Sequence, residues 1–196
     1  MKPFSESSEQ NKKPILDILK QYFNDRPSVL EVGSGTGQHA VYFAEQFPDL
    51  VWHCSDQAEN LNGIRMWLED ASLINIEGPL LLDVTQEVWP VDNISAIFSA
   101  NTVHIMGWDS VEKMFKGIGK VLNSGGIFCL YGPFNYNGEF SSESNAHFDM
   151  WLKQRNPLSG VRDFEALQIL AKKAGLKFIK DHAMPANNRI LVWKKT

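Results

Sequence analysis

The chain has 196 residues, of which 43% are hydrophobic, and this length and composition are typical of one globular domain with a substantial core. With 19 Lys and Arg against 23 Asp and Glu, the formal net charge of -4 argues against the basic surface typical of nucleic-acid-binding proteins. No run of 18 apolar residues and no apolar segment of signal-peptide length occurs, so we expect a cytoplasmic protein without a membrane partner.

Helices and strands alternate along the first half of the chain. Apolar residues spaced three and four apart predict an amphipathic helix within residues 1–24, with Pro14 in its first turn. A short apolar strand at 28–32 then leads into a glycine-rich loop and a second helical stripe. Further strands are predicted at 50–54 and 79–82, with a helix between them.

The alternation continues until an irregular segment interrupts it. Strands are predicted at 94–99 and 127–131, and Asp109 and Glu112 have capping-box spacing at the start of the helix between these strands. Glycine, asparagine and serine then interrupt the chain over 132–162, where only one short helix is predicted.

The chain is predicted to end in a helix and two strands. Asp163 is expected to cap the helix, Gly175 to close it, and residues 176–182 and 189–194 to form the strands. The Val- and Leu-rich strands are typical of a parallel sheet covered on both faces. No repeat, low-complexity tract or linker is found, so we expect a single domain over 1–196.

The stretch VLEVGSGTGQHA carries the strongest functional signal. A strand, a glycine loop and a helix N-terminus together make a site for nucleotide-like ligands, because unpaired backbone amides and the helix dipole converge there. The spacing of Gly33, Gly35 and Gly37 differs from the dinucleotide fingerprint, whose third glycine would fall at Gln38, so a nicotinamide-dependent oxidoreductase is disfavoured. The phosphate-binding P-loop is also excluded, because no Lys-Ser or Lys-Thr pair closes the loop.

This loop resembles the first motif of the class I S-adenosylmethionine-dependent methyltransferases, acidic-x-Gly-x-Gly-x-Gly, with Glu31 as the acidic residue. The resemblance implies a Rossmann-like α/β fold with a central, mostly parallel seven-stranded sheet, an antiparallel last strand and helices on both faces. It also implies S-adenosylmethionine as the cofactor and S-adenosylhomocysteine as its product.

Later polar residues follow the order of landmarks in that family. Asp56 matches the acidic residue that accepts the ribose hydroxyls, and Asp83 matches the residue that meets the adenine amino group. Asn101 ends the fourth strand, under the methionine part of the cofactor. Any one such residue is often a simple turn former, but all lie at the carboxyl edge of the sheet, where open α/β sheets bind ligands. The residues that we expect to bind the cofactor are Glu31, Gly33, Ser34, Gly35, Gly37, Asp56, Gln57, Asp83, Val84 and Asn101.

A closer resemblance covers nearly the full chain. The segments SEQNKKPIL, EVGSGTGQHAVYFAEQFP, LYGPFNYNG, SNAHFD, GVRDFEAL and MPANN are similar to the methyltransferase-like twenty-six family, a mostly uncharacterised group. This family implies the methyltransferase fold and carries no settled substrate.

His104 is the candidate catalytic residue. The sulfonium methyl is already activated, so a base is needed only where the acceptor must lose a proton. His104 follows the fourth strand by a few residues, and a neutral imidazole there can accept a proton. A histidine that only shapes the pocket is the alternative interpretation.

Residues around the irregular segment are expected to choose the acceptor. The helix within 1–24 is expected to fold over the site, and 132–162 to form a lid-like insertion. The aromatic side chains of this insertion either line an apolar pocket or form the core of the lid. The candidate pocket residues are Asn11, Tyr131, Asn135, His147 and Arg162.

The acceptor is expected to be a small molecule. The Asp/Asn-Pro-Pro-Tyr/Phe motif of amino-group nucleic-acid methyltransferases is absent, because Thr102 and Val103 follow Asn101. Cys54 and Cys129 lie in predicted strands and indicate buried thiols rather than a metal site. A divalent-metal catechol-type enzyme needs an acidic pair and an Asn near the acceptor, but Asp83 and Asn101 are assigned to the cofactor, so no metal is expected. A protein methyltransferase, and a non-catalytic cofactor-binding or partner-binding protein with the same fold, are the alternatives. The oligomeric state stays open.

Overall fold

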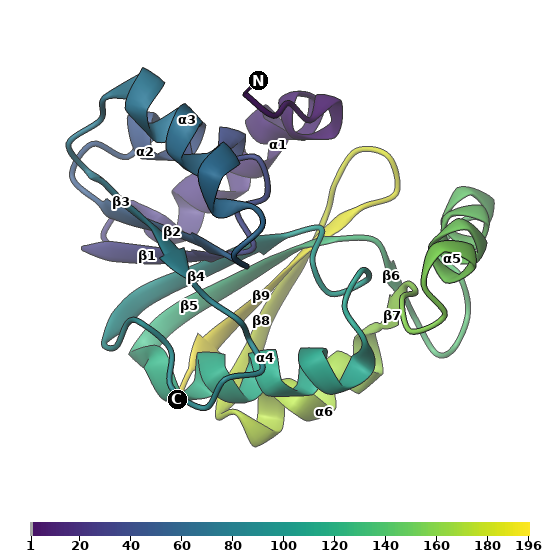
Figure 1. The fold of residues 1–196 in the computed structure, drawn as a ribbon. Helices are drawn as coiled ribbons and strands as arrows, with labels where there is room; N and C mark the ends of the chain where they lie inside the picture. The colour runs from purple at the N-terminus through teal and green to yellow at the C-terminus, as the bar shows by residue number, and fades with distance from the viewer. Residues whose placement is uncertain (1) are drawn as a thin grey trace.

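Seven strands form one sheet in the order β3-β2-β1-β4-β5-β9-β8 in a computed structural model, which describes residues 2–196 (Figure 1). Met1, where the expected first helical segment begins, lies outside the described residues. Neighbouring strands from β3 to β5 run parallel, and β9 runs antiparallel to both β5 and β8. The predicted mostly parallel seven-stranded sheet with an antiparallel last strand is therefore confirmed. The strands are β1 (Ser28–Val32), β2 (Val51–Asp56), β3 (Ile76–Leu81), β4 (Ile94–Ala100), β5 (Leu122–Gly132), β8 (Leu176–Ala183) and β9 (Arg189–Lys195).

Helices cover both faces of this sheet. On one face lie α1 (Glu6–Phe23), α2 (Gln38–Gln46) and α3 (Leu61–Ala71), and on the other lie α4 (Trp108–Val121) and α6 (Phe164–Lys173) (Figure 1). The remaining helix, α5 (Glu143–Arg155), lies to one side of the sheet, beyond the short strands β6 (Phe134–Asn135) and β7 (Arg162–Asp163). Because β6 and β7 pair with each other, the two ends of the irregular segment are tied together.

Alternate residues of the central strands supply two separate cores. In β1, Val29 packs with α1 and α2, whereas Leu30 packs with α4. In β4, Phe98 packs with α1 and α2, and Ile97 packs with α4. All four side chains are fully buried. Burial of each large apolar side chain contributes about 1.5–3 kcal/mol relative to exposure, so the sheet is held from both faces.

The start of α1 differs from the prediction. The helix begins at Glu6, because the Ser5 hydroxyl caps it by accepting a hydrogen bond from the Ser8 amide at 3.2 Å. Glu6 and Glu9 also favour this start, since acidic side chains in a first turn stabilise the helix dipole. Pro14 therefore lies inside the helix rather than in its first turn.

Two predicted caps are wrong. Within residues 2–196 no side chain caps the first turn of α4, whose N-cap is Gly107, so Asp109 and Glu112 form no capping box. Asp163 is the N-cap of α6, but its carboxylate accepts a hydrogen bond from the Gly138 amide at 3.0 Å instead of capping the helix. Tertiary contacts redirect this side chain in a way that local spacing does not reveal.

The third strand begins earlier than predicted. It starts at Ile76 and includes Pro79, at which the prediction placed its beginning. An edge strand tolerates proline because one side of its backbone forms no ladder, and β3 is an edge of the sheet. In the part of the chain that the structure describes, no helix is long and apolar enough to span a membrane.

Candidate functional site

The glycine loop between β1 and α2 has a left-handed backbone at all three glycines. The φ angles are +78° at Gly33, +59° at Gly35 and +92° at Gly37. A Cβ at Gly33 would lie 2.6 Å from Cγ2 of Thr102, and one at Gly37 would lie 3.2 Å from Cα of Ile64. A Cβ at Gly35 would meet no heavy atom of the described chain within 4 Å. Packing thus requires two of the glycines, whereas the third faces open space.

Glu31 supports the loop from beneath. Its carboxylate accepts hydrogen bonds from the Ser34 hydroxyl at 2.9 Å and from Trp52 Nε1 at 3.1 Å. Ser34 Oγ in turn accepts from the Ser55 amide at 3.1 Å. Burial raises the pKa of Glu31 to about 7, and the carboxylate lies outside the cavity that the loop lines. Glu31 therefore holds the loop in place and does not line the cavity.

Asp56, at the end of β2, faces the loop. Its Oδ2 accepts a hydrogen bond from the Gly35 amide at 2.7 Å. Its Oδ1 accepts from the Gln57 amide at 2.7 Å and from Asn60 Nδ2 at 2.9 Å. An ionised carboxylate offers about four acceptor positions, so this group can accept a further hydroxyl donor.

A cavity of about 570 Å³ lies at the carboxyl ends of the strands, bounded by the glycine loop, the ends of β2 and β4, and the first turn of α1. Seven of the ten expected cofactor residues line it, which are Gly33, Ser34, Gly35, Asp56, Gln57, Val84 and Asn101. Glu31 and Gly37 do not line this cavity. Most of the residues that the landmarks indicate therefore meet at one place.

Asp83 lies in an adjoining hollow of about 460 Å³, which shares Gln57 and Leu82 with the first cavity. Its carboxylate accepts a hydrogen bond from the Thr85 amide at 2.8 Å, and this bond lowers the pKa of Asp83. The side chain thus caps a turn while it faces a space next to the cavity.

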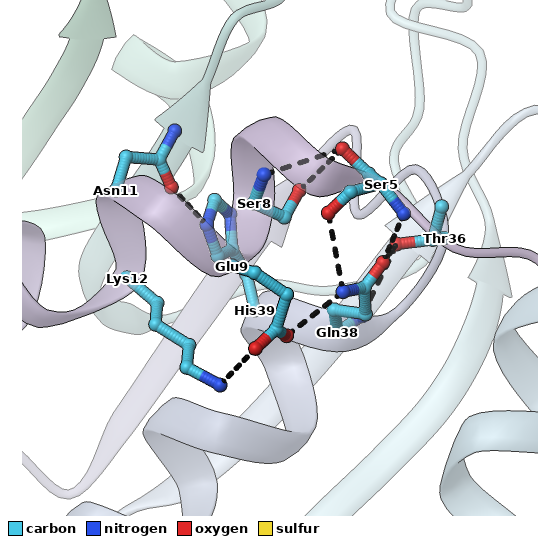
Figure 2. A network of polar contacts seen from close by, with 8 residues as sticks. All are labelled: Ser5, Ser8, Glu9, Asn11, Lys12, Thr36, Gln38 and His39. Atoms are coloured by element: carbon cyan, nitrogen blue, oxygen red, sulfur yellow. Dashed lines mark hydrogen bonds and ion pairs between the residues drawn. The ribbon is translucent and has the colours of Figure 1, made fainter.

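The first turn of α1 is fastened over this cavity by Gln38 of α2 (Figure 2). Gln38 accepts a hydrogen bond from the Ser5 amide, and its Nε2 donates to the Ser5 carbonyl at 3.3 Å and to the Glu9 carboxylate at 2.9 Å. Figure 2 also shows Asn11 beside His39, with Asn11 Oδ1 at 2.7 Å from His39 Nε2. These partners lie about 30 residues apart in sequence, so no local pattern signals the contacts.

A second cavity, of about 720 Å³, adjoins the first. The two share Ser7, Asn101 and Ile105. Its walls come from α1, the loop after β4, the end of β5, α5 and the hairpin between β8 and β9. A ligand in each cavity would therefore meet its neighbour at Asn101, whose backbone is left-handed with φ at +57°.

His104 lines the second cavity and is buried. Within residues 2–196, its Nδ1 has no hydrogen-bond partner. Burial, and to a smaller extent the positive charge of Arg162, lower the pKa of His104 to about 4. The imidazole is therefore neutral near pH 7, and Phe148 packs against it edge to face at 5.3 Å between ring centroids.

Of the five expected pocket residues, two line the second cavity. These are Asn11 and Tyr131. Asn135 is buried outside it, and its Nδ2 donates to the Val161 carbonyl at 3.4 Å. His147 lies outside it as well, exposed on the surface of α5.

Arg162 also lies outside the second cavity. Its Nε donates to the Val103 carbonyl at 2.9 Å, and its Nη2 donates to the carbonyls of Met106 and Leu158. The guanidinium thus positions the loop after β4, which carries His104. Two acceptors in the loop after β4 and one after α5 hold it there, and sequence spacing does not reveal such an arrangement.

The irregular segment forms part of a wall and part of the core. Phe148 and Trp151 of α5 line the second cavity, whereas Phe134 is fully buried in the core and Phe140 is exposed. Both expectations for these aromatic side chains are therefore correct for some of them.

The tip of the hairpin between β8 and β9 holds α5. Asn145 Nδ2 donates to the Asn187 carbonyl at 3.2 Å, and Asn187 Nδ2 donates to the Ser144 hydroxyl at 3.1 Å. All three residues line the second cavity. From the sequence, Asn187 is either a polar candidate for the acceptor site or a simple turn residue of the last hairpin. In the described residues, no group of three or more His, Cys, Asp or Glu side chains is arranged to hold a metal ion.

Solved structures similar to this chain are methyltransferases. The O-methyltransferase family 2 protein from Planctomyces limnophilus DSM 3776, in complex with apigenin, is 14% identical with a TM-score of 0.84, over 97% of this chain and 58% of that one. An O-methyltransferase family protein from Burkholderia thailandensis is 11% identical with a TM-score of 0.81, over 94% and 56%. The S-adenosylmethionine-dependent methyltransferase SibL, in its apo form, is 17% identical with a TM-score of 0.80, over 96% and 55%.

This chain spans little more than half the length of these structures. The likeness shows that it has the Rossmann-like fold of these methyltransferases, as the glycine loop predicts. By sequence, the chain belongs to the family described as "Protein of unknown function (DUF938)", whose model matches residues 2–195.

Proposed function

We propose that this member of a family of unknown function binds S-adenosylmethionine in the first cavity and transfers its methyl group to a small molecule in the second. The observation that carries the proposal is that the two cavities meet at Ser7, Asn101 and Ile105. A methyl transfer needs a donor and an acceptor in line across a short gap. Two adjoining cavities with a common wall meet that requirement.

The residues of the first cavity fit this donor. Gly35 leaves a space that a side chain would fill, and Asp56 retains capacity for hydroxyl donors beside it. Val84 and Asn101 line the same space, and Asp83 faces the adjoining hollow. The proposed roles are ribose contact for Asp56, adenine contact for Asp83 and Val84, and contact with the methionine part for Asn101.

When bound, the sulfonium donor supplies an already activated methyl group, so the chain has to align the acceptor and exclude water. The first turn of α1 covers the shared wall, because Gln38 fastens Ser5 there. His104 faces the acceptor as a neutral imidazole, which can accept a proton or a hydrogen bond. Its role as a base stays a prediction, and so does the resemblance to the methyltransferase-like twenty-six family.

The size of the second cavity fits a small-molecule acceptor. Drug-sized ligands bind in pockets of roughly 300–1,000 Å³, and the second cavity of about 720 Å³ falls in that range. Two similar solved structures are named for small molecules: one is the mitomycin 7-O-methyltransferase MmcR, and the other is the O-methyltransferase in complex with apigenin. A protein acceptor and a non-catalytic binding protein are the competing outcomes.

Calorimetric titration with S-adenosylhomocysteine tests the donor site. We expect binding to the unaltered protein, and an affinity about 10- to 100-fold lower in Gly35→Ala, because the added methyl group occupies the ligand space. Gly138→Ala is the matched control: Gly138 also has a positive φ and open space around it, and it lies outside both cavities. It should share the backbone strain and keep the affinity. No binding by the unaltered protein would overturn the proposal.

Transfer of a labelled methyl group then separates the acceptor classes. We expect label in a metabolite extract after incubation with the protein and labelled donor. Label only in a protein extract would support a protein methyltransferase instead. Binding of S-adenosylhomocysteine without label in either extract would support a non-catalytic binding protein.

A further inference from the structure

The second cavity has no charged side chain in its wall. Among the described residues that line it, none is Asp, Glu, Lys or Arg, whereas Asp56 and Glu59 line the first cavity. Its polar lining is instead dominated by six amide side chains. These are Gln10, Asn11, Asn101, Asn145, Asn187 and Asn188.

The titratable groups of this wall are neutral as well. His104 has a pKa of about 4, because it is buried and near Arg162. Burial raises the pKa of Tyr131, so its phenol keeps its proton near pH 7. A charged ligand would thus lose hydration without gaining a counter-charge, and such desolvation is costly.

Charged side chains near this wall contact partners within the protein. The Arg155 guanidinium lies 4.6 Å from the centroid of the Trp151 ring, and Glu6 accepts a hydrogen bond from Gln10 Nε2 at 3.4 Å. The Arg162 guanidinium donates to three backbone carbonyls of the loop and insertion. The Asp149 carboxylate accepts from Lys153 Nζ at 2.6 Å and from the Val161 amide at 2.9 Å. These bonds fasten α5 and the loop after β4, and they leave neither side chain in the cavity wall.

One side of the cavity carries two aromatic rings that stack on each other. Phe148 and Trp151, one turn apart on α5, have ring centroids 5.7 Å apart and planes only 17° apart. His104 meets the edge of Phe148. A planar ring can pack against this pair, and the surrounding amide oxygens can accept hydrogen bonds from neutral hydroxyl and amide groups. The amide nitrogens of Asn145 and Asn188 each already donate twice within the protein.

We propose that the acceptor is an uncharged, planar aromatic molecule with hydroxyl or amide groups, and that the second cavity discriminates against charged molecules of the same shape. This inference rests on the proposed function, since it names the class of molecule that takes the methyl group. The six amide side chains of the wall and the stacked pair on α5 support this inference.

Three matched phenols test the inference on the full chain saturated with S-adenosylhomocysteine. They are 4-hydroxybenzamide, 4-hydroxybenzoate and 4-hydroxybenzylamine, together with the corresponding naphthalene set, and binding is measured by calorimetry. We expect a neutral amide to bind at least ~10-fold more tightly than either charged relative, because the cavity supplies no counter-charge. Equal or tighter binding of a charged member, or no binding of either neutral member, would overturn the inference. Absence of S-adenosylhomocysteine binding would instead count against the proposed function.

A specificity change provides an independent test. Gln10 is exposed on α1 and lines the cavity, so Gln10→Lys adds a cation to its rim. We expect it to strengthen binding of the hydroxybenzoate ~3- to 10-fold, with unchanged affinity for S-adenosylhomocysteine. Gln21→Lys is the control, since Gln21 is exposed on the same helix and lies outside the cavity. The same gain in both variants would overturn the inference.

The aromatic wall is tested by truncation. We expect Trp151→Ala to weaken binding of the neutral naphthalene compound ~5- to 10-fold, because an aromatic pair contributes beyond its buried area. Met150→Ala is the control, because Met150 is a neighbouring exposed residue outside the cavity. Unchanged binding in Trp151→Ala would show that the Trp151 ring on α5 does not take part in binding this compound.

Discussion

The two cavities are built in different ways. The first is lined by the loops that follow β1, β2 and β4, and its main features are left-handed glycines and one carboxylate at a strand end. The second is assembled from five separate segments, and its main features are side-chain amides and rings. The comparison teaches that backbone geometry specifies the proposed donor site, whereas tertiary assembly specifies the proposed acceptor site.

The stability of the protein should depend on pH through Glu31, which supports the glycine loop of the first cavity. This is the largest effect that we expect. Burial raises the pKa of Glu31 to about 7, so the folded protein keeps a proton that the unfolded chain loses at lower pH. The free energy of unfolding should therefore fall as pH rises from about 4.5 to 7, by about 3 kcal/mol from this group.

Glu31→Gln keeps the hydrogen-bonding shape and removes the titration. Urea unfolding at several pH values should show a flatter dependence than in the unaltered protein. Glu45→Gln, at an exposed position on α2, is the control and should leave the slope as it is. An equal slope in Glu31→Gln would contradict the role of this buried carboxyl group.

Asp56→Ala should weaken ligand binding in the first cavity and not in the second. It removes the acceptor of three hydrogen bonds at the glycine loop, and hydrogen bonds to charged groups contribute about 1.5–3 kcal/mol. We expect about 10- to 100-fold weaker S-adenosylhomocysteine binding by calorimetry. Asp83→Ala, in the adjoining hollow, should have a smaller effect, and a larger effect there would exchange the roles of the two carboxylates.

A clash can be introduced and then relieved at the base of the first cavity. Gly33→Ala should lower the free energy of unfolding by about 2 kcal/mol, because the new Cβ would lie 2.6 Å from Thr102 Cγ2 on a left-handed backbone. Adding Thr102→Ser removes that methyl group and keeps the hydroxyl that bonds to Ser99. Thermal unfolding should show that the double variant regains part of the lost stability. No recovery would mean that backbone strain at residue 33 alone explains the loss.

Two asparagines provide the smallest and most selective comparison. Asn145→Ala should weaken binding of the neutral phenol about 10-fold, the equivalent of one lost hydrogen bond, and leave S-adenosylhomocysteine binding unchanged. Asn60→Ala, which removes a donor to Asp56, should do the reverse. Both constants can be measured by calorimetry on the same samples, and a shared loss in both variants would refute the separation of the sites.

The sequence predicts the first region better than the second for the same physical reason. Periodicity and glycine spacing are local signals, and with the order of later polar residues they locate the sheet and seven residues that line the first cavity. The contacts of Gln38 with Ser5, and of Asn145 with Asn187, join segments that are distant in sequence. The sequence predicts Arg162 in the pocket because it is polar and lies beside the irregular segment, but three backbone carbonyls bind it outside the second cavity.

The first turn of α1 is a wall of both cavities, because Ser7 lines each of them. Two residues earlier, Ser5 is joined to Gln38 through both its amide and its carbonyl. Withdrawal of this turn would therefore open both cavities at once, and the two Gln38 contacts with Ser5 hold it closed.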